Sequence, residues 1–338
     1  MTLSSVAGFR VGHAEVVGGG SGCTVVLGPF LGAVEARGMA TGTRELDVLS
    51  PYHLVGGVDA VLLAGGSAFG LAAAEGVMAW LAERGEGFDT GVAPVPLVPG
   101  AVIFDLVGGR ARPGPAEGRR ACEAASTDPV VEGRVGAGAG ATVGKILGPG
   151  GAVDGGVGSA AAPWGDYRMG ALAVVNALGD VMDAEGGILA GARSPDGAFL
   201  GTDSFLLGGG GSGGFPGASG VKGGEGFEGP AVGANTTLVV VGTDFPLSRV
   251  DLGRLARLAS GAFSRVISPV NTPFDGDVLF ALSSGVGGTE LPPEELLSLG
   301  VLARTVTEEA IRRGVSADSG NGVDGGERPR ERRRGHRQ

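Results

Sequence analysis

A glycine-rich tract that runs directly into an apolar segment constrains this chain more than any other feature of its sequence. The tract extends from Leu207 to Gly233, and the segment Thr236–Val241 (TTLVVV) follows within the motif GANTTLVVV. Glycine favours turns and close backbone contacts, whereas threonine and valine favour strands. We therefore expect a loop that ends at Asn235 and a strand that begins at Thr236.

Composition places this junction in a folded, acidic chain. Glycine makes up 70 of the 338 residues, whereas its usual share is about 7%. Because 43% of the residues are hydrophobic, we expect a packed core with many tight turns rather than a low-complexity chain. The net charge is −10, although six arginines lie between Glu327 and Gln338. An acidic body argues against nucleic acid as a partner, and we expect the Arg-rich end, residues 315–338, to be disordered.

Targeting and disulfide signals are not found in the sequence. The two cysteines, Cys23 and Cys122, form no CxxC motif and predict no disulfide framework. The N-terminus has neither a basic start nor an apolar core of the kind found in signal peptides. The longest apolar stretch, residues 68–82, is interrupted by Glu75 and is too short to span a membrane. We expect a soluble, cytoplasmic protein with no membrane partner.

Strands and helices alternate without a regular βαβ rhythm, which predicts an α+β fold. We expect a hairpin from Cys23 to Arg37 that turns at Pro29–Leu31. A second strand, a turn at Gly179-Asp180 and a return are expected between Ala171 and Asp183. Further strands are expected at residues 59–66 and 277–285. Helices are expected at residues 67–84, capped by Ser67, and at 115–126, 247–266 and 293–313.

The Asn235–Thr236 junction suits a chain that cuts itself and then uses the new N-terminal threonine as a nucleophile. The hydroxyl of Thr236 would attack the preceding carbonyl, and water would open the resulting ester. The freed α-amino group has a reference pKa of about 7.7–8.0 and would serve as general base. Two alternatives remain: an ordinary loop-to-strand junction, and a glycosylation sequon at Asn235, relevant only in a secreted protein.

The sequence contains few of the residues that other common forms of catalysis require. The only histidines are His13, His53 and His336, so neither a Ser-His-Asp triad nor a His and Cys metal site is expected. The run Gly138–Lys145 (GAGATVGK) imitates a phosphate-binding loop but has Ala139 and Ile146 at positions where that motif requires glycine and a hydroxyl residue. We therefore expect neither a nucleotide cofactor nor a metal.

Four polar residues are candidates to assist Thr236. Lys145 is one of only two lysines and lies in a Gly-rich, apolar setting; it either bonds the Thr236 hydroxyl or is an exposed loop residue. Asp275 and Asp277 share a face if their backbone is extended, and they either pair with Lys145 or form an Asp-Gly turn. Asn176, in an apolar run, either lines an oxyanion hole or forms a turn.

Seven motifs follow one another along the chain: LLAGGSAFGL, VPGAVIFD, GRVGAGAGATVGK, GGVGSA, VVNALGDV, GANTTL and SPVNTPFDGDVLFAL. In their order and spacing they resemble the P1 peptidase family of self-processing hydrolases, over about Gly12 to Arg313. This family includes the L-aminopeptidase/D-esterases, the β-aminopeptidases and the 6-aminohexanoate (nylon) oligomer hydrolases.

The resemblance implies cleavage between Asn235 and Thr236 into chains 1–235 and 236–338 that stay associated, within one catalytic domain, residues 1–314. It implies Thr236 as nucleophile and its amine as base. Asn176 then corresponds to the family's oxyanion-stabilising amide, and Lys145 corresponds to its active-site lysine. Asp275 and Asp277 correspond to its acidic pair. These residues match the Thr-type members, whereas the β-aminopeptidases use a Ser nucleophile with Ser and Glu at the acidic pair.

The resemblance also implies a four-layer αββα sandwich, similar in layering to N-terminal-nucleophile hydrolases, and a tetramer of processed heterodimers. The expected activity is an aminopeptidase acting on small peptides, amides or esters. Phe104 stands in the presumed substrate pocket where the nylon-oligomer hydrolases carry Tyr, which makes nylon-oligomer cleavage the second choice. The third is acyl transfer of the kind performed by ornithine acetyltransferases, and the non-enzymatic alternative is a Gly-rich assembly protein.

Overall fold

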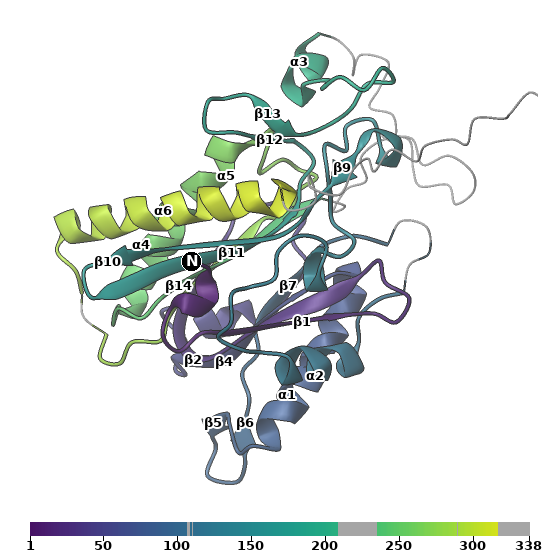
Figure 1. Cartoon of the computed structure of the whole chain (residues 1–338). Coiled ribbons are helices and arrows are strands. Elements are labelled where there is room, and N and C mark those ends of the chain that lie inside the picture. The colour runs from purple at the N-terminus through teal and green to yellow at the C-terminus, as the bar shows by residue number, and fades with distance from the viewer. Residues whose placement is uncertain (107–108, 110, 209–234, 289, 317–338) are drawn as a thin grey trace, which may run out of the picture.

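The structure is a computed structural model of the chain that describes residues 1–106, 109, 111–208, 235–288 and 290–316 (Figure 1). The glycine-rich loop from residue 209 and the Arg-rich end from residue 317, both named in the sequence predictions, lie outside the described residues. Within the described ranges, no helix is long and apolar enough to cross a membrane.

The strands that position the candidate site belong to one continuous, mixed sheet. Thr236–Thr243 forms the central strand β14, which pairs antiparallel with β11 on one side and parallel with β16 on the other. In spatial order the sheet contains β10 (Gly156–Trp164), β11 (Tyr167–Asn176), β14, β16 (Val278–Ser283), β2 (Gly22–Ala36), β4 (Gly57–Ala64), β7 (Gly100–Val102) and β3 (Thr43–Arg44), with β1 (Arg10–Glu15) also paired to β2.

Strand β2 is long enough to belong to both halves of this sheet. Its first part pairs with β1 and β4, and its last part, Leu31–Ala36, pairs with β16. The predicted hairpin between Cys23 and Arg37 is therefore wrong. The chain does not reverse at Pro29; instead the register with β4 shifts between Leu27 and Phe30. A bulge of this kind accommodates a proline, which cannot donate to the ladder.

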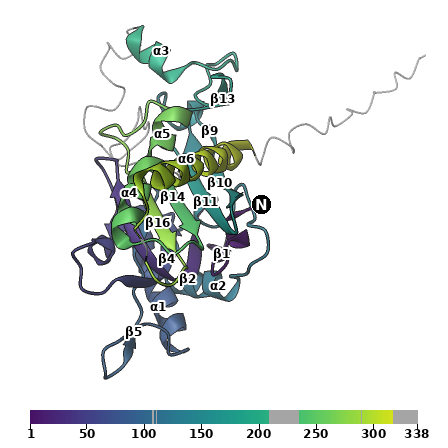
Figure 2. The same ribbon diagram turned by 90° about the vertical axis from the view of Figure 1, so that its left-hand side faces the viewer.

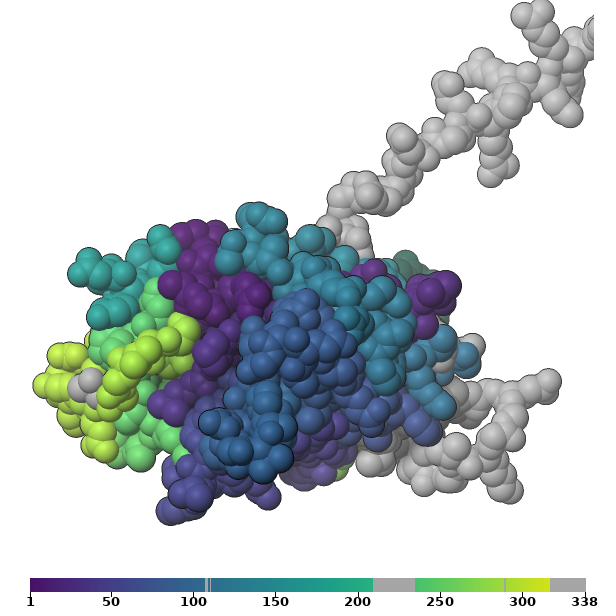
Figure 3. Space-filling view, turned by 90° about the horizontal axis from the view of Figure 1, so that it is seen from below, coloured from purple at the N-terminus to yellow at the C-terminus, as the bar shows by residue number. Residues whose placement is uncertain are grey.

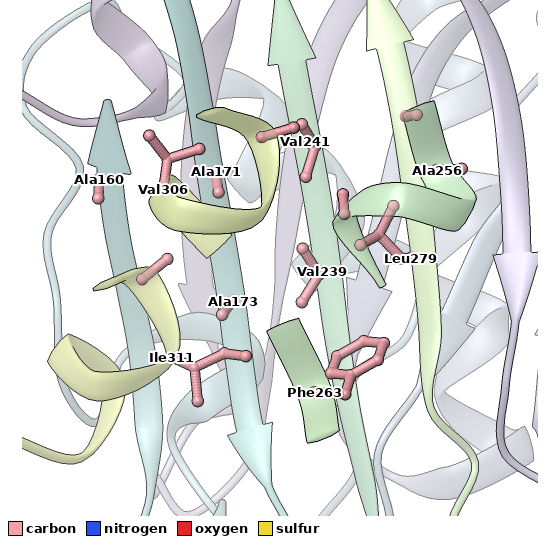
Figure 4. Packing of buried hydrophobic residues seen from close by; sticks show 14 of the residues in the cluster. Ala160, Ala171, Ala173, Val239, Val241, Ala256, Phe263, Leu279, Val306 and Ile311 are labelled. Atoms are coloured by element: carbon pink, nitrogen blue, oxygen red, sulfur yellow. The ribbon is translucent and has the colours of Figure 1, made fainter. Parts of the chain in front are cut away.

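Side chains of the sheet alternate between two apolar layers. In β14, Val239 and Val241 pack against the outer helices α4 (Arg249–Ala259), α5 (Gly261–Val266) and α6 (Pro293–Ser316), as Figure 4 shows for Phe263, Val306 and Ile311. Leu238 and Val240 instead face the inner layer, where they meet side chains of β2 and β4. This period of two is expected of a strand buried on both faces.

A third apolar cluster joins the other face of β2 and β4 to helices α1 (Ala73–Ala82) and α2 (Pro115–Glu123). These helices lie on the side of the molecule opposite α4 and α6 (Figures 1 and 2). In Figure 3, the blue part of the chain, which contains these helices, covers the middle of the visible face. Three clusters between four layers confirm the expected α+β, αββα arrangement.

The second predicted hairpin, between Ala171 and Asp183, is also wrong. Strand β11 ends at Asn176, and the returning strand β12 (Asp180–Met182) pairs with β13 (Ile188–Ala190) and β15 (Ile267–Ser268) rather than with β11. Gly179 allows this departure, because a Cβ there would lie 2.2 Å from the carbonyl oxygen of Pro269. The glycine permits a close crossing of two segments instead of a reversal.

Two predicted helices differ in their internal structure. The helix predicted at residues 247–266 begins at Arg249 and consists of two helices, α4 and α5, which join at Ser260. The segment after Gly66 begins with a 3-10 turn, Ser67–Ala72, and Ser67 makes no capping bond, so the α-helix starts only at Ala73. The predicted strands at residues 59–66 and 277–285 are confirmed as β4 and β16, and the last helix is confirmed as α6.

The remaining short elements connect the layers. The short helices are η1 (Leu3–Ser5), η2 (Leu46–Leu49), η3 (Ser67–Ala72), η4 (Gly136–Gly138), η5 (Pro149–Gly151) and α3 (Thr202–Leu207). The short strands are β5 (Phe88–Asp89), β6 (Pro94–Val95), β8 (Thr142–Val143) and β9 (Val153–Asp154).

Candidate active site

Thr236 is the first residue of β14 and is almost completely buried, with 2% of its surface exposed. Its partner across the antiparallel ladder is Asn176, the last residue of β11. On the other side, Asn235 forms an isolated parallel bridge with Asp275. The structure thus brings together, at one end of the central strands, three segments that are far apart in the sequence.

The carbonyl oxygen of Asn235, which precedes Thr236, accepts two hydrogen bonds. The Thr236 hydroxyl donates to it over 2.5 Å, and the main-chain N–H of Gly276 donates over 2.8 Å. Asn235 is fully buried, and its side-chain amide donates to the carbonyl of Phe274 at 3.4 Å. The hydroxyl of Thr236 therefore lies beside the peptide bond that the sequence predicts to be cut.

Asp275 and Asp277 are both buried, and each carboxylate orders the backbone near Thr236. The carboxylate of Asp277 accepts the N–H of Thr237 at 2.6 Å and that of Asn271 at 3.3 Å. The carboxylate of Asp275 accepts the N–H of Thr272 at 2.8 Å. The two acids fix the positions of Thr236 and of the segment that faces it.

Lys145 and Asn176 form the other side of the site. The Lys145 ammonium donates to the Asn176 side-chain oxygen at 2.7 Å and to its main-chain oxygen at 2.9 Å. The same side-chain oxygen also accepts the N–H of Thr142 at 3.1 Å. Because the oxygen of Asn176 faces these donors, its amide nitrogen is the donor end, and it bonds the carbonyl of Phe104 at 3.4 Å.

Gly144 sets the position of Lys145, and this explains the glycine-rich run that resembles a phosphate loop. Gly144 has φ of 71°, and a Cβ there would lie 2.0 Å from the main-chain nitrogen of Ala192. Its N–H bonds the carbonyl of Gly179, and the N–H of Lys145 bonds that of Leu178. The glycine therefore provides a close backbone crossing next to the site.

We expect Gly144→Ala to lower the free energy of unfolding by about 2 kcal/mol or more, because a Cβ is disfavoured at this φ and collides with Ala192. Urea unfolding would show the change as a lower midpoint. Gly253→Ala is the matched control, since nothing lies within 4 Å of a Cβ there and alanine favours a helix over glycine by about 1 kcal/mol. Equal midpoints for Gly144→Ala and the native chain would contradict the expectation.

Burial and mutual charge shift the pKa values of the cluster toward neutrality. Loss of hydration lowers the pKa of Lys145 to about 7, although Asp275, Asp105 and Asp277 act in the opposite direction. Burial, followed by the charge of Asp275, raises the pKa of Asp277 to about 8. Burial also raises the pKa of Asp275, while its hydrogen bonds with Thr272 oppose that change. Such a cluster can accept and release a proton near neutral pH.

The structure adds one acid that the sequence reasoning missed. Asp105 is buried, its carboxylate accepts the N–H of Gly66 at 2.7 Å, and its charge acts on Lys145. The sequence feature that could have indicated Asp105 is its position directly after the apolar run VIF. The neighbouring residue, Phe104, is half-buried, and its carbonyl contacts Asn176; its role in a substrate pocket stays a prediction. Among the described residues, no group of three or more His, Cys, Asp or Glu is arranged to hold a metal.

Comparison with known structures places this site in a recognised fold. A β-aminopeptidase from a Burkholderia species superposes with a TM-score of 0.66 at 20% identity, over 93% of this chain and 85% of that one. An L-aminopeptidase/D-Ala-esterase/amidase from Ochrobactrum anthropi, described as a variant of the Ntn-hydrolase fold, gives 0.65 at 19% identity, with the same coverage of both chains. The chain therefore has the fold of these aminopeptidases.

Sequence relatives give the family. An uncharacterised aminopeptidase of Mycobacterium tuberculosis is 43% identical over 319 residues, which cover 87% of this chain and 83% of the relative. A 6-aminohexanoate-oligomer endohydrolase of a Kocuria species is 34% identical over 285 residues, covering 82% and 73%. The model of Peptidase family S58 matches residues 2–328. The chain therefore belongs to peptidase family S58, and the activity it shares with these relatives is that of an aminopeptidase or amidohydrolase.

Proposed function

We propose that the chain cuts itself between Asn235 and Thr236 and then works as an amidohydrolase with Thr236 as nucleophile. The observation that carries the proposal is the Thr236 hydroxyl, which lies 2.5 Å from the carbonyl oxygen of Asn235 in a buried site with proton-exchanging groups. An ordinary strand-opening threonine needs neither a half-buried lysine nor two buried acids beside it.

In the self-cleavage step, the Thr236 oxygen bonds to the carbonyl carbon of Asn235. Neutral Lys145 takes the hydroxyl proton, which then passes to the leaving nitrogen as the peptide bond breaks. Water opens the ester that results, leaving a carboxylate on Asn235 and a free amine on Thr236. The charge-neutral form of Lys145 is available because burial lowers its pKa to about 7.

In the hydrolytic cycle, the freed amine of Thr236 takes the hydroxyl proton while the oxygen attacks a substrate carbonyl. The side-chain amide nitrogen of Asn176 stabilises the oxyanion, since Asn176 lies directly opposite Thr236 and its side-chain oxygen is occupied by Lys145. Acyl transfer to Thr236 releases the amine product, and water then releases the acid. Asp275 and Asp277 hold the nucleophile and Lys145 in place.

An aminopeptidase acting on small peptides, amides or esters is the first choice, supported by the name of the 43% identical relative. Cleavage of 6-aminohexanoate oligomers is the second, supported by the name of the 34% identical relative. We also propose that the processed pair, chains 1–235 and 236–338, assembles as a homotetramer without a cofactor.

The first test is the intact mass of the freshly purified and the incubated protein, followed by a substrate panel. We expect two fragments that meet at Asn235/Thr236, and release of N-terminal residues from peptide amides by the cut form only. An uncut chain that hydrolyses the panel would show that cleavage is not part of the activity. A cut chain that hydrolyses only 6-aminohexanoate oligomers would select the second choice of substrate.

A further inference from the structure

The main-chain N–H of Gly276, between the two site aspartates, points at the peptide bond that precedes Thr236. It donates to the carbonyl oxygen of Asn235 at 2.8 Å. This bond belongs to the parallel bridge between Asn235 and Asp275. A carbonyl that already accepts a main-chain donor is polarised toward attack at its carbon.

We propose that the Gly276 N–H is the oxyanion donor of the self-cleavage step, an inference that rests on the proposed function. When the Thr236 oxygen bonds to the carbonyl carbon of Asn235, the carbonyl electron pair moves to the oxygen that Gly276 holds. The charge returns when the bond from carbon to the Thr236 nitrogen breaks. A donor aimed at this oxygen before the reaction stabilises the developing charge without reorganisation.

The surrounding backbone holds the donor rigidly. The carbonyl of Asp275 accepts the N–H of Ala40 at 2.9 Å, and that of Asp277 accepts the N–H groups of Arg37 and Gly38 at 2.8 and 3.1 Å. Segment 275–277 is therefore tied to the chain that follows β2 on one side and to Asn235 on the other. These bonds fix the direction of the N–H.

A glycine is needed at this position because of space and not because of backbone conformation. Gly276 is not among the glycines with positive φ. A Cβ on it would instead lie 2.8 Å from the Thr236 hydroxyl oxygen and 2.7 Å from the carbonyl oxygen of Ala40. The missing side chain lets the nucleophile and the donor reach the same carbonyl group.

This donor differs from the one proposed for substrate hydrolysis. The side-chain nitrogen of Asn176 bonds the carbonyl of Phe104, whereas the Gly276 N–H bonds the Asn235 carbonyl directly. Self-cleavage therefore has a donor that is in position before any substrate is present. The sequence motif FDGD, interpreted as a carboxylate pair or an Asp-Gly turn, contains this third functional group.

An ester in place of the amide between Asp275 and Gly276 removes the N–H and nearly preserves the shape of the chain. We would introduce it by cell-free translation with glycolic acid at position 276, and follow the intact mass over time. The matched control is the same ester at Gly285, whose N–H donates to the Ser283 hydroxyl, away from Thr236. Circular dichroism during heating would verify that both proteins fold.

We expect the position 276 ester to slow self-cleavage by about 10²- to 10³-fold, the usual cost of losing one oxyanion donor, and the position 285 ester to cleave at the native rate. A folded position 276 ester that cleaves within about threefold of the native rate would overturn this inference alone. A native chain that stays uncut would overturn both the inference and the proposed self-cleavage.

Discussion

Replacing Thr236 by alanine is expected to leave the chain as a single piece of full mass and to abolish hydrolysis. The substitution removes the hydroxyl that bonds the carbonyl of Asn235, and with it the atom that would carry the acyl group. Both activities disappear together because the uncut chain has neither a nucleophile nor a free amine at position 236. Intact mass spectrometry and the peptide-amide assay measure the two losses on the same sample.

Two control variants separate the hydroxyl of Thr236 from local packing. Thr236→Ser keeps the oxygen, so we expect cleavage and hydrolysis to persist. Thr237→Val removes a buried hydroxyl that has no hydrogen-bond partner among the described residues, yet leaves the N–H that Asp277 accepts. We expect that protein to cleave normally. Full cleavage of Thr236→Ala would mean that Thr236 is not the nucleophile. An uncut Thr237→Val would mean that local packing alone controls cleavage, so that the loss in Thr236→Ala would not identify the nucleophile.

Replacing Lys145 by methionine is expected to slow self-cleavage by about 10²- to 10⁴-fold, the usual contribution of a general base. The native rate is expected to rise with pH and to level off above a midpoint near 7, since burial lowers the pKa of Lys145 to about 7 and only the neutral amine accepts a proton. Timed intact-mass measurements across a pH series would give this profile.

Lys145→Arg distinguishes a base from a positive charge, because a guanidinium keeps its charge but cannot be deprotonated in proteins. We expect it to cleave as slowly as Lys145→Met; near-native cleavage would assign Lys145 a purely electrostatic role.

Asp105→Asn provides an independent test of Lys145 as the base, through the direction in which the pH profile moves. The charge of Asp105 raises the pKa of Lys145, so its removal should move the midpoint of the profile to lower pH. A shift to higher pH would exclude Lys145 as the base.

The sequence was sufficient for the elements whose composition or apolar period is distinctive over several residues. The β-branched, apolar run Thr236–Val241 and the helical spacing of residues 293–313 predict β14 and α6 directly. The sequence prediction was wrong where a proline or glycine can occur in more than one kind of backbone structure. Pro29 and Gly179 were both interpreted as turns, whereas one lies at a bulge and the other at a crossing. Local chemistry does not distinguish these uses, because the partner segment is distant in the sequence.

The candidate site shows the same division. Thr236, Lys145 and the aspartates are unusual in their own surroundings, so residue type alone singled them out. Asp105 affects Lys145 because the two are close in space, which their separation in the sequence does not indicate. The Gly276 donor is a main-chain N–H, which every residue except proline carries. Their roles can be proposed only once the structure shows that Gly276 lies beside the Asn235 carbonyl and that Asp105 acts on Lys145.

The order of strands has a consequence for reversibility. Strands β14 and β16 belong to the part of the chain that begins at Thr236, yet they lie between β11 and β2, which belong to the part before it. An uncut molecule can refold by itself at any dilution. Once the proposed cut is made, the two pieces must first meet, and refolding becomes a second-order process that depends on protein concentration. Maturation would thus convert a stability set by equilibrium into one set by the rate of unfolding.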